Sequence, residues 1–503
     1  MKNNVKSYEK YIFPIIAVVV LFFAFRSDGS VLNMKWFGIP GSSVFKGCSD
    51  TISLVLLFSL LILLILHLCN CNETIMMGVA VAVAMIGFAL VIPNGRTPDE
   101  ASHFRRAFDL ASSRILPLKI SDRDGGSDYL PAAVLDFENP NAELDYNDIC
   151  VVSFSNTALY SPVGYVPQAV GIRIAMLFTN NVSRLFTGGR ISNMIVAFIL
   201  CVLALKAAPF GKRIIFWLIM LPVNLQVMIS MSTDGTVFAL AVLWTVYIMK
   251  LREQQEMIRG KQIASLFIMG ALLSQCKIVY IVLLFLVFLL PRTIFRNNKS
   301  SMLIRGGVFS TALLLNLVWL IISAGYLISF NPGVDPAGQV QYILSHPAGY
   351  IRTVLWTTMN YHALWLMELG RIVSGYAEIQ EMVWLILWAV LFIEFWLERG
   401  PAIDYTLKDV VFLCFTAIAG IVLIYTSLYV QWTPVGSEMI DGIQGRYFLP
   451  LAFPAMCLLI QLRRRAVPDY HGQKKNTSPF YLMSVLLFCS AVVLLNLQSW
   501  YLR

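Results

Sequence analysis

The chain has 503 residues, of which 58% are hydrophobic and only 13% are charged. Soluble domains carry roughly 25% charged residues, so this composition excludes an ordinary soluble enzyme. The net charge of +9 comes from basic residues in short loops between apolar runs, which is the pattern of loops retained in the cytoplasm. The charge therefore indicates a lipid bilayer as partner and does not indicate nucleic-acid binding.

Apolar runs of about 20 residues are long enough to cross the roughly 30 Å hydrocarbon layer of a membrane. Lys2, Lys6 and Lys10 place the N-terminus in the cytoplasm, and the basic loops fix the direction of each later run. In chain order, we expect spans at residues 11–25, 51–68, 74–92, 191–205, 214–231, 236–249, two short helices within 263–291, 306–328, 382–398, 409–428, 447–462 and 479–498. The sequence thus predicts an all-α polytopic membrane protein with about 13 transmembrane helices.

The same alternation places two long loops, residues 94–188 and 329–380, outside the cytoplasm. The first loop is rich in Asp and Glu, and such a loop is poorly suited to the anionic cytoplasmic leaflet. Its segment 158–178 is apolar, but a crossing there would invert every later loop. We interpret it as an interfacial or re-entrant helix, because its Pro and Gly residues suit a broken helix packed against protein.

We expect three parts along the chain. Residues 1–73 form an N-terminal transmembrane hairpin, and residues 74–462 form a transmembrane core that carries both long loops. Residues 463–503 form a basic cytoplasmic loop and the last transmembrane helix. Aromatic and histidine side chains of the second loop would form either an acceptor-binding surface or an interfacial aromatic belt. These are Trp356, Tyr361, His362 and Trp365.

Four unusual polar sites are expected on the outer side. The first begins with Pro98-Asp99-Glu100, which favours a helix start because carboxylates stabilise the positive end of a helix. On that helix, Asp99, His103 and Arg106 share one face, and Arg105 adjoins them. This pattern is typical of a capped interfacial helix with solvated charges, or of a carboxylate base supported by a histidine or arginine.

The other three sites are single charges at span ends. Asp234 either caps the returning helix or joins a site. Lys277 lies at a membrane-embedded turn, where a lysine is costly unless it reaches the interface or meets an anion. Arg446 opens a span from the outer side, where a bound anion such as phosphate would explain it. Together these charges favour a substrate with a headgroup phosphate, a lipid tail and a transferable group, as in a polyprenyl-phosphate sugar.

Several short motifs carry a resemblance to a known superfamily. They are Pro98-Asp99-Glu100-x-x-His103-x-x-Arg106-Ala107, Tyr160-Ser161-Pro162-x-x-Tyr165-x-Pro167-Gln168, Arg190-x-x-Asn193, Ser232-x-Asp234, Lys277-x-x-Tyr280 and Gln444-Gly445-Arg446-Tyr447-Phe448-Leu449-Pro450. The first resembles the Asp-Glu-x-x-Tyr signature of GT-C superfamily glycosyltransferases, with His103 in place of the aromatic residue. The whole set is similar to an uncharacterised bacterial family of GT-C-like membrane proteins, domain of unknown function 2142.

The resemblance implies a GT-C-like core with a long extracytoplasmic first catalytic loop, in a bacterial cytoplasmic membrane. It implies an inverting glycosyltransferase that moves a sugar from a polyprenyl-phosphate (undecaprenyl-phosphate) donor to a cell-surface glycan or glycolipid acceptor. The catalytic base would be Asp99, and Glu100, the second expected catalytic residue, would position sugar hydroxyls or a divalent ion. The expected substrate-binding residues are His103, Arg105, Arg106, Tyr160, Asp234, Lys277, Arg446 and Tyr447. Two carboxylates also offer oxygen ligands for a divalent metal ion, although the sequence does not require a metal or any other cofactor.

Three other functions use similar residues. A lipid-linked sugar flippase or transporter would bind the same anion. A polysaccharide polymerase or ligase would depend more on arginines in a large late loop. A non-catalytic assembly subunit would show no turnover of the donor.

Overall fold

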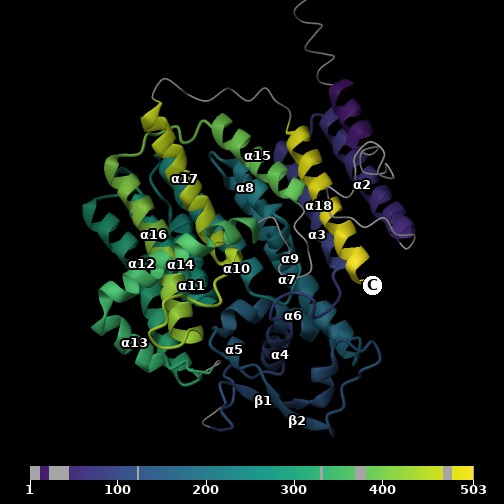
Figure 1. The fold of residues 1–503 in the computed structure, drawn as a ribbon. Helices are drawn as coiled ribbons and strands as arrows, with labels where there is room; N and C mark the ends of the chain where they lie inside the picture. Colours follow the sequence, from purple (N-terminus) through teal and green to yellow (C-terminus); the bar gives the residue numbers. More distant parts are fainter. Residues whose placement is uncertain are drawn as a thin grey trace, which may run out of the picture.

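A computed structural model describes residues 12–21, 45–121, 124–328, 332–368, 381–467 and 479–501. These residues are mostly helical (Figure 1). The helices of the bundle are α2 (Phe45–Leu68), α3 (Glu73–Val91), α7 (Val182–Ala207), α8 (Lys212–Ile219), α9 (Pro222–Met228), α10 (Asp234–Gln254), α11 (Gly260–Cys276), η4 (Ile278–Leu289), α12 (Asn298–Ala324), α13 (Pro336–Ser345), α14 (Pro347–Glu368), α15 (Glu381–Leu397), α16 (Leu407–Trp432), η6 (Gly445–Phe448), α17 (Leu449–Ala466) and α18 (Phe480–Tyr501).

Six segments of the described chain are long and apolar enough to cross a membrane. They are Glu73–Val91, Val182–Ala207, Asp234–Gln254, Asn298–Ala324, Leu407–Trp432 and Gly445–Ala466. Shorter apolar helices cover Ile12–Leu21, Ile52–Leu68, Ile278–Leu289, Val383–Leu397 and Phe480–Leu495. These segments coincide with expected spans, so the chain is a polytopic helical membrane protein. The count of 13 spans stays a prediction.

One expected span is wrong as a continuous helix. Residues 214–231 form two helices, α8 and α9, with a break at Met220 and Leu221. Pro222 has no backbone N–H and its ring crowds the preceding turn, so α8 cannot continue through it. The side-chain amide of Asn224 donates to the carbonyl of Leu218 at 2.6 Å and so satisfies a group exposed by the break. Both helices are buried in protein, which is where broken helices are tolerated within membrane proteins.

Helix α10 lies at the centre of the bundle. It packs against α7, α9, α11, η4 and α17, and 78% of its most apolar 18-residue stretch is buried. The buried indole of Trp244 donates to the carbonyl of Leu283 at 2.8 Å, which ties α10 to η4. This central position matters because α10 begins with Asp234, one of the residues of the candidate site.

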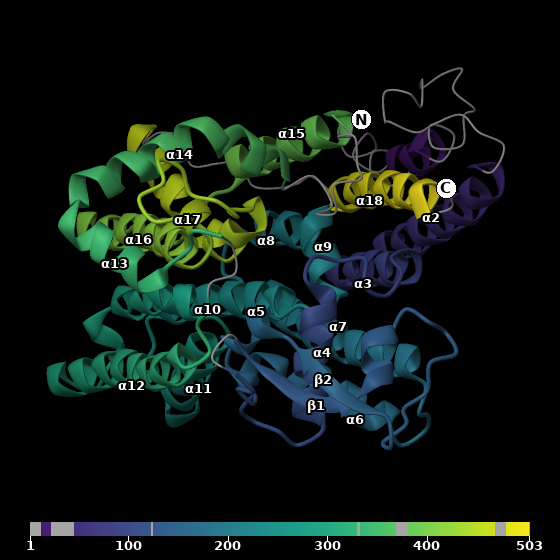
Figure 2. The same cartoon turned by 60° about the horizontal axis from the view of Figure 1, so that its bottom comes forward.

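The last helix lies beside the first ones. Helix α18 packs against α2 and α3, and its C-terminal end lies next to α2 in Figure 2. The hairpin expected at 1–73 and the last helix therefore contact each other in space, although they stand at opposite ends of the sequence.

The acidic loop forms a folded unit at one end of the bundle, at the bottom of Figure 1. Its elements are α4 (Glu100–Ala111), β1 (Ser127–Pro131), η2 (Ala132–Asp136), β2 (Ile149–Ser153), α5 (Ser155–Ala158), η3 (Pro162–Tyr165) and α6 (Val166–Ala175). The strands pair antiparallel, with Ser127 opposite Ser153. The described chain is otherwise mostly helical and agrees with the all-α expectation, with this two-stranded sheet as a small addition. The polar, turn-rich sequence between the strands did not indicate the sheet.

A small aromatic core holds this unit against the bundle. The ring of Phe186, on α7, lies 4.8 Å from the rings of both Phe104 and Phe137, measured between centroids. All three side chains are buried. The segment 158–178 is broken as expected, into η3 and the ten-residue α6, which is too short to cross about 30 Å of hydrocarbon.

Candidate functional site

Four charged residues from distant parts of the sequence meet at helix ends. Asp99 immediately precedes α4, and Asp234 is the first residue of α10. Lys277 is the extended residue between α11 and η4, and Arg446 lies in the short turn η6 before α17. We call Asp99, Asp234, Lys277 and Arg446 the charged cluster.

Ion pairs link the four members in a row. The ammonium of Lys277 donates to Oδ1 of Asp234 at 2.8 Å. The Nε atom of Arg446 lies 3.6 Å from Oδ2 of Asp234, and its Nη2 atom donates to Oδ2 of Asp99 at 3.3 Å. Two cations and two carboxylates thus balance, and Arg446 bridges the carboxylates.

Several polar atoms at the cluster are buried without hydrogen bonds. The Arg446 side chain is 4% exposed, and within the described chain its Nε and Nη1 atoms have no hydrogen-bond partner. The same holds for Oγ1 of Thr233, Nε2 of Gln275 and Oε1 of Gln444, which lie close to members of the cluster in sequence. Each buried unpaired group costs about 1–3 kcal/mol, so this concentration is typical of a ligand-binding site.

Asp99 is held in a strained backbone conformation. Its φ of 57° lies in the left-handed region, and its carboxylate makes no capping hydrogen bond to α4. This conformation costs a non-glycine residue roughly 1–2 kcal/mol, and such strain gathers at functional sites. The carboxylate is 49% exposed, so Asp99 is the accessible acid of the cluster.

Tyrosine rings surround the cations. The Lys277 ammonium lies 5.4 Å from the ring centroid of Tyr160 and 5.0 Å from that of Tyr447, which is close enough for cation–π attraction. The hydroxyl of Tyr280 donates to the carbonyl of Tyr447 at 2.8 Å. This bond fixes η6 against η4 and so helps hold Arg446 beside Lys277.

His103 is buried next to the cluster. Burial lowers its pKa to about 4, although Asp234 and Asp99 oppose the shift, so the ring is neutral at pH 7. Its Nδ1 atom lies 2.8 Å from the hydroxyl of Tyr165. The tautomer of His103 decides which of the two atoms donates this hydrogen bond: where Nδ1 accepts from the hydroxyl, the neutral ring carries its proton on Nε2.

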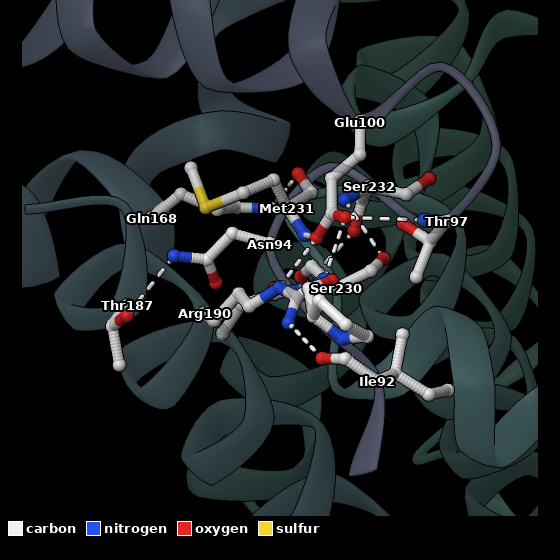
Figure 3. Close-up of polar contacts among 12 residues, drawn as sticks. Ile92, Asn94, Thr97, Glu100, Gln168, Thr187, Arg190, Ser230, Met231 and Ser232 are labelled. Atoms are coloured by element: carbon white, nitrogen blue, oxygen red, sulfur yellow. Dashed lines mark hydrogen bonds and ion pairs between the residues drawn. The ribbon is translucent and has the colours of Figure 1, made fainter. Parts of the chain in front are cut away.

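Glu100 is not among the ion pairs of the cluster and instead pairs with Arg190 (Figure 3). Both oxygens of Glu100 accept from the guanidinium, from Nε and from Nη2, at 2.6 Å each. The backbone N–H of Met231 donates to the same carboxylate at 3.0 Å. Arg190 also donates to the carbonyl of Ile92 at 2.8 Å. The structure therefore places Asp234, and not Glu100, in the charged cluster, and Glu100 holds the loop to the bundle.

Arg105 and Arg106 also lie outside the cluster. Arg105 donates to the carbonyl of Ser153 at 3.3 Å. Arg106 is fully buried and donates to Oδ2 of Asp109 at 2.5 Å. Burial and a hydrogen bond with Asp128 raise the pKa of Asp109 to about 8, despite this ion pair. Neither arginine is thus placed to hold the same anion as Arg446, because both serve the fold of the loop.

Comparison with known families gives one match. The family model described as "Predicted membrane protein (DUF2142)" matches residues 127–454, well over half of the chain. The chain belongs to this family. No curated protein and no solved structure matches it. The matched segment contains Tyr160, Asp234, Lys277 and Arg446 and begins after Asp99.

The second long loop of this DUF2142 protein reaches the site through α14. Oε2 of Glu368 accepts from the backbone N–H of Gly445 at 2.5 Å. A Cβ at Gly445 would lie 2.4 Å from the carbonyl oxygen of Trp365, so only glycine permits this approach. The Trp365 ring lies 5.5 Å from the Phe448 ring. Of the aromatic residues expected at an acceptor surface, buried Trp365 thus supports the Arg446 turn, whereas Trp356 and His362 are exposed elsewhere on α14.

Several residues beside the charged cluster were not predicted as site residues. Tyr165 and Tyr280 stand in the short sequence motifs, but their hydrogen-bond partners, His103 and Tyr447, are distant in the chain. Thr233 and Gln275 stand out by residue type no more than their neighbours do. Their proximity to Asp234 and Lys277 in the chain is the only sequence signal that points to them. Among the described residues, no group of three or more His, Cys, Asp or Glu side chains gathers in a metal-binding arrangement.

Proposed function

We propose that this DUF2142 protein is a membrane glycosyltransferase. It moves a sugar from a polyprenyl-phosphate donor to a cell-surface glycan or glycolipid acceptor at the extracytoplasmic face. The observation that supports this proposal most strongly is the charged cluster, in which two N–H groups of a buried arginine have no hydrogen-bond partner among the described residues and lie beside the accessible carboxylate of Asp99, whose backbone is strained.

The cations suit the donor phosphate. In the described chain Nη1 of the planar Arg446 guanidinium has no hydrogen-bond partner and Nε has only the 3.6 Å ion pair with Asp234, so the side chain can donate to phosphate oxygens without losing its bond to Asp99. Lys277 brings a second positive charge, held in place by Asp234 and by the tyrosine rings. A phosphate bound here would be stabilised as it leaves the sugar, when its negative charge grows.

Asp99 suits the role of base. The acceptor hydroxyl oxygen forms a bond to the anomeric carbon while the bond from that carbon to the phosphate oxygen breaks. The hydroxyl proton passes to Asp99, and the bonding electrons leave with the polyprenyl phosphate. Since the cluster is balanced, a bound phosphate adds net negative charge, which favours proton uptake by a nearby carboxylate. Attack from the side opposite the phosphate inverts the anomeric centre.

His103 offers a fixed donor for a hydroxyl of the sugar. In this proposal Nδ1 accepts from the hydroxyl of Tyr165, 2.8 Å away, and the neutral ring carries its proton on Nε2. A neutral donor can bind a sugar hydroxyl without adding charge to the cluster. Tyr160 stacks on the His103 ring, with 6.3 Å between centroids and 9° between planes, and so fixes its orientation.

Binding of the leaving product tests the phosphate assignment. Polyprenyl phosphate would be titrated against purified protein in nanodiscs, with Arg446→Gln as the test variant and Arg96→Gln as control. Arg96 is an exposed arginine of the acidic loop, where it pairs with Glu138. Hydrogen bonds to charged groups contribute about 1.5–3 kcal/mol, so Arg446→Gln should weaken binding roughly 10- to 100-fold.

Equal affinity of the Arg446→Gln variant and the parent protein would overturn this assignment. Binding that is intact in the parent but never followed by sugar transfer, together with movement of the lipid across proteoliposome membranes, would instead favour a flippase.

A further inference from the structure

One face of α6 carries a row of exposed apolar side chains. Val166, Val170 and Ile174 follow each other at intervals of four residues, so they lie on one side of the helix. The row continues beyond the helix with Leu177, 76% exposed, and Phe178, 82% exposed. A contiguous apolar surface of this kind marks an interaction site rather than scattered surface residues.

The opposite face of α6 is already used. Gly171 meets Gly188 of α7 so closely that a Cβ at Gly171 would lie 2.3 Å from the Gly188 carbonyl oxygen. Gln168 and Ile172, on the same side, are fully buried. The apolar row is therefore the face of α6 that its packing against α7 leaves exposed.

The partner of α6 is a candidate membrane span. Helix α7 has 26 residues, more than the about 20 that cross a bilayer, and the span expected from its sequence begins only at residue 191, so its first turns would stand at the level of the lipid headgroups. Gly188 lies in those turns. Farther along, α7 exposes Ile191, Ile195 and Ile199, again at intervals of four. The apolar surface of α6 thus stands beside the end of a lipid-facing stripe.

Basic side chains flank the same region. Arg173 on α6 and Arg184 on α7 are both exposed. At an interface, arginine side chains extend along apolar surface and reach lipid phosphates with their charged ends. Apolar residues on one face with arginine beside them are the composition of helices that lie in the membrane surface.

We infer that the exposed face of α6 lies in the bilayer, at the boundary between headgroups and acyl chains, with lipid as its occupant. The face begins at Val166, directly after Tyr165, which bonds His103 beside the charged cluster. The site is then held at headgroup level, where a phosphate on a lipid would be presented to Arg446 and Lys277. This last step rests on the proposed function, whereas the position of α6 in lipid does not.

Nitroxide accessibility in nanodiscs tests the inference in the full-length protein. A ketone-bearing phenylalanine analogue is introduced at position 178 or 174 and coupled to a spin label, which leaves the native cysteines in place. Position 195 on α7 is the control for a lipid-facing site. Position 149, where Ile149 is exposed on β2, is the control for a site in water.

Labels at 178 and 174 should collide more with oxygen, which partitions into lipid, than with a water-soluble nickel complex. The ratio of oxygen collision to nickel collision at positions 178 and 174 should match the ratio at position 195 and differ at least several-fold from the ratio at position 149. A ratio like that of position 149 would place α6 in water and overturn the inference. Low collision with both reagents would show that protein, such as a second copy of the chain, covers the face, and would also overturn it. Neither outcome depends on catalysis, so a failure here is distinct from failure of the proposed function.

Discussion

At the scale of single residues, two adjacent acids have different surroundings. Asp99 is half-exposed, strained and next to Arg446, whereas Glu100 is buried against Arg190. The sequence predicted both as site residues because their spacing gives no sign of which way each points. That direction is set by the left-handed turn at Asp99, which a sequence pattern does not reveal. The consequences of removing each charge should therefore differ.

We predict that Glu100→Gln destabilises the protein. Removing one partner of a buried ion pair leaves the other uncompensated and costs about 3–5 kcal/mol. The thermal unfolding midpoint in detergent should fall by several degrees. Asp99→Asn, which also replaces a carboxylate by its amide, should leave the midpoint nearly unchanged. Equal midpoints for the two variants would contradict the structural role of Glu100.

We predict a pH dependence of stability from His103. Burial lowers its pKa to about 4 in the folded protein, whereas the unfolded chain protonates near pH 6.5. Between these values the unfolded chain binds the extra proton, so the free energy of unfolding rises with pH and levels off above about 6.5. Over this whole pH range His103 changes the free energy of unfolding by about 3 kcal/mol.

This dependence is measured as the unfolding midpoint at about pH 5 and pH 7. Because His103→Asn removes a contribution to stability that rises with pH, its shift in midpoint from about pH 5 to about pH 7 should be more negative than that of the parent protein, with the exposed His362→Asn as the matched variant. The buried Asp109, whose raised pKa of about 8 contributes the opposite slope, is present in all three proteins and cancels in the comparison. A His103→Asn slope identical to that of the parent would refute the prediction.

At the scale of elements, apolar length located most helices, and turn chemistry decided where they break. Pro222 ended α8 inside an apolar run that length alone would count as one span. The two helices within 263–291 were expected because basic loops bound both ends, and the structure has α11 and η4 there. The hairpin of β1 and β2 was missed because its pairing joins residues as many as 26 positions apart, such as Ser127 and Ser153.

We predict that the contact between α6 and α7 depends on glycine. In Gly171→Ala the new methyl would meet backbone of Gly188, which cannot move aside as a side chain can. Such overpacking costs typically about 1–3 kcal/mol, so the unfolding midpoint should fall. Gly306→Ala on α12 is the matched control, since nothing lies within 4 Å of its added Cβ. Its midpoint should be unchanged or slightly raised. A similar midpoint for both variants would argue against the close packing.

At the scale of the whole molecule, the alternation of basic loops predicts which charged residues lie on the same side of the membrane. Assigning the span ends to one side predicted that Asp99, Asp234, Lys277 and Arg446 lie together, and the structure brings them into contact. Arg106 was assigned to the same site because it shares a helix face with Asp99 and His103, and Arg105 because it adjoins them, but both arginines bond within the loop instead. Charges fixed to span ends were thus predictable, and charges within a folded loop were not.

The central claim is that this cluster transfers a sugar from a lipid phosphate. The most direct measurement is sugar transfer by the purified protein in nanodiscs from a defined polyprenyl-phosphate sugar, with Asp99→Asn compared to Asp145→Asn. Asp145 is an exposed acid of the same loop. Loss of a general base typically costs a factor of about 100 to 10,000, so Asp99→Asn should fall by that amount while it retains polyprenyl-phosphate binding. Full transfer by Asp99→Asn, at the rate of the parent protein and the Asp145→Asn control, would contradict the account.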